Sequence, residues 1–95
     1  MFLGAYHFDG DPAELACGHQ RLLDRFPLAS LDLHLCVLRD GGITVFDACP
    51  SREVFTAFSR SAEFSAEVTA AGLPAPRPEP VGEVHVAYLR EAVKP

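Results

Sequence analysis

The middle of the chain has the pattern of two β-strands joined by a tight turn, and this pattern restricts the fold more than any other feature. Between residues 31 and 38, three leucines and a valine alternate with an aspartate, a histidine, a cysteine and a leucine. That period of two is typical of a strand whose two faces differ. Residues 39–42 (Arg-Asp-Gly-Gly) indicate a hairpin turn, and residues 43–49 form the returning strand.

A helix is predicted on each side of this hairpin. Asp11-Pro12 supplies an N-cap and a favourable first residue for the first helix, which Pro27 ends. The apolar face of that helix consists of Leu15, His19, Leu22, Leu23 and Phe26. The second helix begins at Ser51, but Ser61 is a second N-cap followed by an apolar stripe in a different phase. We therefore expect a kinked or broken helix that ends at Gly72.

Two further strands are predicted near the ends of the chain, over Phe2–Phe8 and Val81–Arg90. Between residues 73 and 80 prolines occur at alternate positions, which favours a stiff polyproline connector. The resulting order, strand-helix-strand-strand-helix-strand, predicts a single α+β domain over residues 1–95 with the ferredoxin-like fold. Right-handed crossovers place both helices on one face of a four-stranded antiparallel sheet. The other face is apolar, and a second copy of the chain is its simplest cover, so we expect a homodimer.

The acidic balance of the chain disfavours two classes of partner. The net charge is −5 and the isoelectric point is about 5.2, whereas nucleic acids and anionic membranes attract clustered lysine and arginine. No apolar run approaches the ~20 residues of a membrane span, and the first residues lack the basic start of a signal peptide. Together with three widely spaced cysteines, these features predict a cytoplasmic protein with reduced thiols.

The stretch from Val45 to Phe64 carries the most specific motifs of the chain. It contains Asp47-Ala48-Cys49-Pro50-Ser51-Arg52-Glu53 and then Ser61-Ala62-Glu63-Phe64, and Gly82-Glu83-Val84-His85-Val86 follows near the end. In these motifs and in the order of its elements, the chain resembles the dimeric α/β-barrel superfamily and its antibiotic-biosynthesis monooxygenase-like group. The resemblance implies a homodimeric enzyme that oxygenates or cyclises an aromatic or polyketide-like molecule without a cofactor.

The hairpin also gathers side chains that can carry chemistry. If its turn has two residues, His34, Cys36, Asp47 and Cys49 share one face of the sheet. His34, oriented by Asp47, could then act as a general base or tune a thiol. Cys49 precedes a helix N-terminus, which lowers the pKa of a thiol. We predict His34, Asp47, Cys49 and Tyr88 as catalytic residues, while a structural polar pair on the sheet or dimer surface is the alternative.

Aromatic side chains at helical and strand spacing suggest a cavity for a small apolar or aromatic molecule, although core packing explains them as well. The candidate substrate-binding residues are Tyr6, His19, Phe26, Phe55, Phe58 and Phe64. We expect no cofactor. Three histidines on strands, His7, His34 and His85, are a weaker candidate set of metal ligands. A non-catalytic ligand-binding or accessory dimer module is a further alternative.

Overall fold

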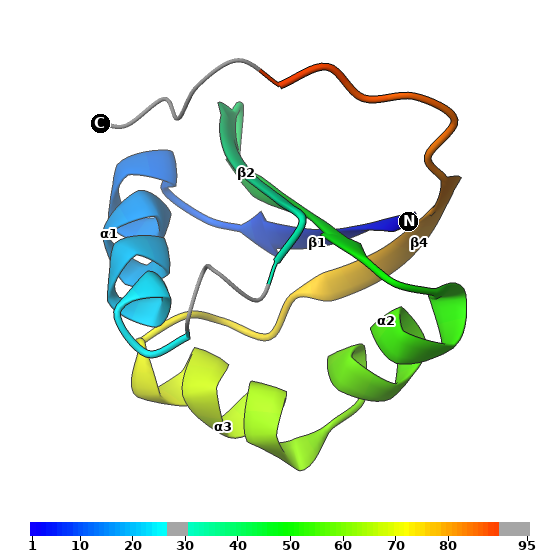
Figure 1. Ribbon diagram of the computed structural model, residues 1–95. Helices are drawn as coiled ribbons and strands as arrows, with labels where there is room; N and C mark the ends of the chain where they lie inside the picture. Colours follow the sequence, from blue (N-terminus) through cyan, green and yellow to red (C-terminus); the bar gives the residue numbers. More distant parts are fainter. Residues whose placement is uncertain (27–30, 90–95) are drawn as a thin grey trace.

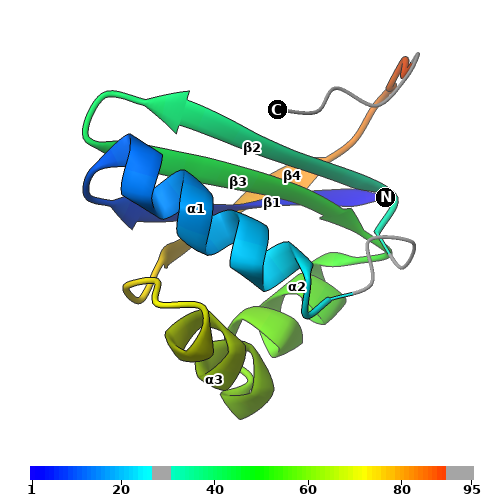
Figure 2. The ribbon, with the colours of Figure 1, turned by 90° about the vertical axis from the view of Figure 1, so that its left-hand side faces the viewer.

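In the part of the chain that the structure describes, four antiparallel strands form one sheet, and three helices lie against a single face of it (Figures 1 and 2). The computed structural model describes residues 1–26 and 31–89. The strands are β1 (Phe2–Asp9), β2 (Leu33–Arg39), β3 (Gly42–Cys49) and β4 (Arg77–Glu83). The helices are α1 (Pro12–Leu23), α2 (Arg52–Ser59) and α3 (Ala62–Ala70). The strand order β2-β3-β1-β4 and the one-sided helices give a ferredoxin-like α+β arrangement, so the predicted fold class is confirmed.

The helices begin where the capping residues predict. Asp11, Ser51 and Ser61 each accept a hydrogen bond from the backbone N–H three residues further on, over 3.0, 3.2 and 3.1 Å. The second helical region is therefore two short helices, α2 and α3, because the cap at Ser61 starts a new helix. Gly72 follows the end of α3 with a φ of +78°, a conformation that favours glycine. The predicted stop at Pro27 lies outside the described residues.

The last strand differs from the prediction. Strand β4 spans Arg77–Glu83 instead of residues 81–90, so Pro78 and Pro80 belong to the sheet and not to a polyproline connector. Among the described residues, β4 is an edge strand whose single partner is β1. Proline has no backbone N–H group, so it cannot donate a hydrogen bond to a neighbouring strand. An edge strand tolerates proline where the backbone nitrogen points away from the sheet, because no neighbouring strand lies on that side. The chain then leaves the sheet, and residues 84–89 form an irregular tail.

The core lies between the sheet and the three helices. Phe55 of α2 packs directly on Gly4 of β1, where an added Cβ would lie only 2.1 Å from the phenyl ring. Tyr6 contacts Phe55 and Phe64, with ring centroids 5.4 and 5.0 Å apart. The absence of a side chain at Gly4 therefore allows α2 to approach the sheet, and the aromatic cluster holds α2 and α3 against β1.

The opposite face of the sheet is different in character. Among residues 1–26 and 31–89, no helix covers it (Figure 2). His7 lies on this face, with its ring nitrogens 3.0 Å from Thr44 Oγ1 and 2.7 Å from Glu79 Oε1. The strand register puts Leu35 and Val37 on the same face, where they are 47% and 42% exposed. This surface thus combines a polar centre with exposed apolar side chains.

Candidate functional site

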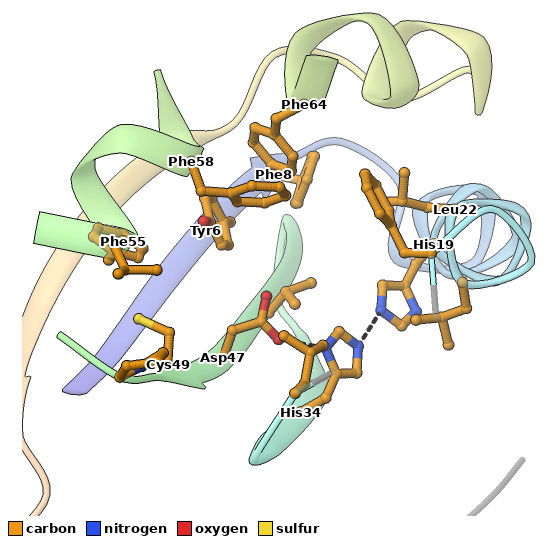
Figure 3. A pocket seen from close by; sticks show the side chains of 16 residues that line it. Tyr6, Phe8, His19, Leu22, His34, Asp47, Cys49, Phe55, Phe58 and Phe64 are labelled. Carbon is orange, nitrogen blue, oxygen red and sulfur yellow. Dashed lines mark hydrogen bonds and ion pairs between the residues drawn. The ribbon is translucent and has the colours of Figure 1, made fainter. Parts of the chain in front are cut away.

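A cavity of about 240 Å³ lies between the sheet and the helices, and its wall is almost entirely apolar (Figure 3). All six residues predicted to bind a substrate line it: Tyr6, His19, Phe26, Phe55, Phe58 and Phe64. Three of the four predicted catalytic residues, His34, Asp47 and Cys49, line it as well. The structure therefore brings most of the candidate residues to one place.

His34 and Asp47 face each other across the central hairpin. The turn between β2 and β3 has two residues, Asp40 and Gly41, and the register pairs His34 with Asp47. Gly41 has a φ of +77°, which this tight turn accommodates because the residue is glycine. His34 Nδ1 donates a hydrogen bond to the Asp47 carboxylate. Their side chains are only 17% and 19% exposed, so little water competes for this bond.

The other nitrogen of His34 contacts a second histidine. His34 Nε2 lies 2.8 Å from Nε2 of His19, which α1 contributes (Figure 3). The two rings are within 8° of parallel and their centroids are 5.0 Å apart. With the nitrogens so much closer than the centroids, the rings meet edge to edge, as a linear hydrogen bond between the two nitrogens requires. Asp47, His34 and His19 thus form a continuous hydrogen-bonded row along the cavity wall.

His19 is held in its neutral form. Burial and, to a smaller extent, the positive charge of His34 lower the pKa of His19 from 6.5 to about 4, and the negative charge of Asp47 opposes both effects. At neutral pH a single proton therefore lies between the two Nε2 atoms of His19 and His34. His34 either accepts this proton's hydrogen bond from His19 or, as an imidazolium, donates it to His19. A histidine with a carboxylate on one side and a neutral acceptor on the other is well placed to take up and release a proton.

Tyr6 supplies the second kind of polar group in the wall. Burial, followed by the nearby Asp47 carboxylate and Cys49 sulfur, raises the pKa of Tyr6 well above its usual range. The phenol therefore keeps its proton and can donate a hydrogen bond to an oxygen atom in the cavity. Its ring is 3% exposed and is fixed by its packing on Phe55 and Phe64.

The prediction of an activated thiol at Cys49 is wrong. Burial raises the pKa of the Cys49 thiol, and although hydrogen bonds to the backbone of Ser51 and Phe55 lower it, the charge of Asp47 adds to the rise. The thiol is instead neutral and donates to the Ser51 carbonyl oxygen over 3.3 Å. Proximity to the start of α2 therefore does not outweigh burial beside a carboxylate in setting the pKa of this thiol.

Other candidates lie away from the cavity. Tyr88, predicted as catalytic on the last strand, is 91% exposed in the tail after β4. His7 lies on the opposite face of the sheet, and His85 is exposed beyond the end of β4. The three histidines of the candidate metal site are therefore not brought together. In the part of the chain that the structure describes, no group of three histidine, cysteine, aspartate or glutamate side chains could hold a metal ion.

Sequence reasoning missed the contact between His19 and His34. The periodicity of the first helix placed His19 on its buried face, and strand parity paired His34 with Asp47, but neither pattern shows how a helix lies over a strand. The signal available in the sequence was a histidine within an otherwise apolar helical stripe. A polar residue in such a stripe requires a buried partner, and the second histidine provides it.

The fold and this row of side chains define a class of protein, an α+β domain with an apolar cavity and an Asp-His-His row in its wall. Comparisons with protein-family models, curated proteins and solved structures found no match for this chain. Within residues 1–26 and 31–89, every helix is too short or too polar to cross a membrane.

Proposed function

We propose that the protein is a cofactor-free enzyme that binds a flat, largely apolar molecule and removes a proton from it through His34. The observation that carries this proposal is the position of His34 between Asp47 and His19 in the wall of an otherwise apolar cavity. A carboxylate that orients a histidine and stabilises its imidazolium form is a recurrent arrangement for general base catalysis.

The size and lining of the cavity indicate the kind of substrate. At a packing density of about 0.75, a cavity of about 240 Å³ is filled by roughly 180 Å³ of ligand, which corresponds to two or three fused rings. Phe55, Phe58 and Phe64 offer ring faces and edges to such a molecule. Tyr6 can bind a carbonyl or phenolate oxygen. These features fit an aromatic or polyketide-like compound with an acidic phenol, enol or ring C–H group.

The charges in the site favour proton removal. A substrate proton reaches Nε2 of His34 through His19: the Nδ1 atom of His19 takes the substrate proton as its Nε2 atom gives its own proton to His34, and the positive charge then rests next to Asp47. The substrate anion is stabilised by the hydrogen bond from Tyr6. By resemblance to the monooxygenase-like group, the anion then either closes a ring or reacts with dioxygen. In the second reaction the substrate supplies the electrons, one oxygen atom enters the ring, and the other leaves as water.

The test is turnover of anthrone, a hydroxyanthracene-type compound, in air without added metal. Anthraquinone formation and oxygen consumption are followed together, and the rate without protein is subtracted. We expect His34→Ala to lower the protein-dependent rate by about 10²-fold or more, the usual contribution of a general base. His85→Ala, which removes an exposed histidine, should leave the rate unchanged. Equal rates for the protein and for His34→Ala would refute the role of His34.

A binding module without catalysis is the second candidate, and the strongly apolar wall is the observation that favours it. In that case anthrone raises the melting temperature but is not turned over, and Phe58→Ala weakens the effect. A protein with neither turnover nor a melting shift for two- and three-ring phenols contradicts both candidates.

The proposal includes a cytoplasmic homodimer. Exposed apolar side chains collect on the uncovered side of the sheet and in the tail, including Leu35, Val37 and Val86 at 47%, 42% and 58% exposure. A small domain gains stability by covering such a surface with a second copy of itself. The oligomeric state at micromolar concentration, measured by light scattering, tests this part of the proposal.

A further inference from the structure

The titratable side chains in the cavity wall never add up to a positive charge. The described wall contains Tyr6, His19, His34, Asp47 and Cys49. Tyr6, His19 and Cys49 are neutral at neutral pH, because burial is the largest influence on each of them. When His34 is an imidazolium, the Asp47 carboxylate beside it already balances its positive charge. One carboxylate, with or without one imidazolium, therefore gives the wall a net charge that is negative or zero.

The cations near the cavity point elsewhere. Among residues 1–26 and 31–89, no lysine or arginine side chain lines the cavity. Arg21 and Arg25 are neighbours in sequence of lining residues, but both bind the region of α3. Arg21 Nε donates to the Ala71 carbonyl oxygen over 3.0 Å, and Arg25 forms an ion pair with Glu67. A negatively charged molecule in the cavity therefore meets no unpaired cation from the described part of the wall.

We propose that the cavity accepts its substrate only in an uncharged form, and that Asp47 excludes molecules with a carboxylate, phosphate or sulfonate group. Moving an anion from water into an apolar cavity is costly unless it meets an opposite charge. Here the anion meets a carboxylate instead, and the repulsion adds to that cost. An uncharged phenol, enol or carbon acid avoids both costs. The proton that it loses stays on the histidines, so the net charge of the cavity and its contents does not change.

The arrangement of the wall places Asp47 where it can select against an anion. Tyr6, His34 and Asp47 come from the strands β1, β2 and β3, whereas Phe58 and Phe64 come from the helices α2 and α3 (Figure 3). A flat molecule with one polar edge therefore turns that edge toward the strands and its hydrocarbon edge toward the helices. The charged group of an anionic analogue would lie on the same side as Asp47. This inference rests on the proposed function, whose substrate class it narrows to neutral, weakly acidic ring compounds.

Three ligands with one ring system test this inference: 2-naphthol, 2-naphthamide and 2-naphthoate. At neutral pH the phenol, with a pKa of ~10, and the amide are uncharged, whereas the carboxylic acid, with a pKa of ~4, is ionised. The amide and the carboxylate have nearly the same shape, so their dissociation constants compare charge. Equilibrium dialysis, with the free ligand measured by its fluorescence, gives the Kd values for the wild type, Asp47→Asn and Glu53→Gln. Glu53→Gln is the control, because it removes an exposed carboxylate that does not line the cavity.

We expect the wild type to bind 2-naphthol and 2-naphthamide, and to bind 2-naphthoate at least about tenfold more weakly than the amide. Asp47→Asn should lower this ratio severalfold, because it removes the repelling charge, and Glu53→Gln should leave the ratio unchanged. A wild-type ratio below tenfold overturns the inference, and so does a ratio that Asp47→Asn does not change. The wild-type ratio needs no substitution, so it decides the matter even if Asp47→Asn does not fold.

These outcomes are distinct from a failure of the proposed function. Equal binding of 2-naphthoate and 2-naphthamide overturns the charge selection, but turnover of anthrone that depends on His34 would stand. Equal turnover by the wild type and His34→Ala refutes the catalysis, and the charge selection then holds for a binding cavity. If the amide binds as weakly as the carboxylate while 2-naphthol binds well, shape and not charge is selected, and the inference is wrong. If neither uncharged ligand binds, the inference and the proposed function fail together.

Discussion

The neutral state of His19 makes the stability of the protein dependent on pH, and His19→Gln isolates this dependence. In the unfolded chain His19 binds a proton near its ordinary pKa of 6.5, whereas in the folded protein it does so only near pH 4. Between these values the unfolded state holds more protons, so folding stability falls as the pH falls. The contribution is fully present above pH 6.5 and is lost as the pH falls toward 4.

The size of the effect follows from the two pKa values. The difference between 6.5 and about 4 corresponds to about 3 kcal/mol when the pH is below both. At pH 5 most of that loss has occurred, about 2 kcal/mol relative to pH 8. For a domain of this size it lowers the melting temperature by roughly 10 °C. Glutamine does not titrate, so His19→Gln should lose about 2 kcal/mol less than the wild type between pH 8 and pH 5.

The assay is urea unfolding followed by far-ultraviolet circular dichroism at pH 8, 6.5 and 5 and constant ionic strength. The comparison is the difference between the two pH profiles, because titratable groups that lie away from His19 contribute equally to both proteins. His85→Gln is the matched control and should follow the wild type, since His85 is exposed. If His19→Gln and the wild type lose the same free energy between pH 8 and 5, the argument that burial keeps His19 neutral is wrong.

Two further substitutions test how the fold positions the cavity. Gly4→Ala places a Cβ about 2.1 Å from the ring of Phe55, so we expect a loss of ~1–3 kcal/mol in thermal unfolding. Phe55→Leu in the same chain should recover part of that loss, whereas strictly additive effects would contradict the close approach. Asp11→Ala removes the N-cap of α1 and should cost about 1 kcal/mol in urea unfolding. The exposed Asp32→Ala serves as its control, and equal effects of the two substitutions would count against the cap.

The order of the elements could be predicted from the sequence because its signals are local. Asp11, Ser51 and Ser61 mark the starts of helices through side chains that bind backbone groups only three residues away. The pairing of His34 with Asp47 also followed from a local feature, since a two-residue turn fixes which residues face each other. These signals fixed the fold class and the polar pair of the site.

The remaining features depend on contacts between distant parts of the chain. Pro78 and Pro80 favour a connector when read alone, and only their place at the edge of the sheet makes a strand there acceptable. Because β4 ends at Glu83 and not at residue 90, Tyr88 lies outside the sheet. The contact of His19 with His34 depends on how α1 crosses β2, and the raised pKa of the Cys49 thiol depends on burial beside Asp47. Neither follows from spacing along the sequence.

The prolines of β4 also limit how far the sheet can grow between molecules. A continuous intermolecular sheet, as in a fibril, requires each molecule to offer two edges that donate and accept hydrogen bonds. Here Pro78 and Pro80 remove donors from one of the two edges. Lateral growth therefore ends at β4 of every molecule that joins, and a protein with so much exposed apolar surface is protected against fibril formation from that side.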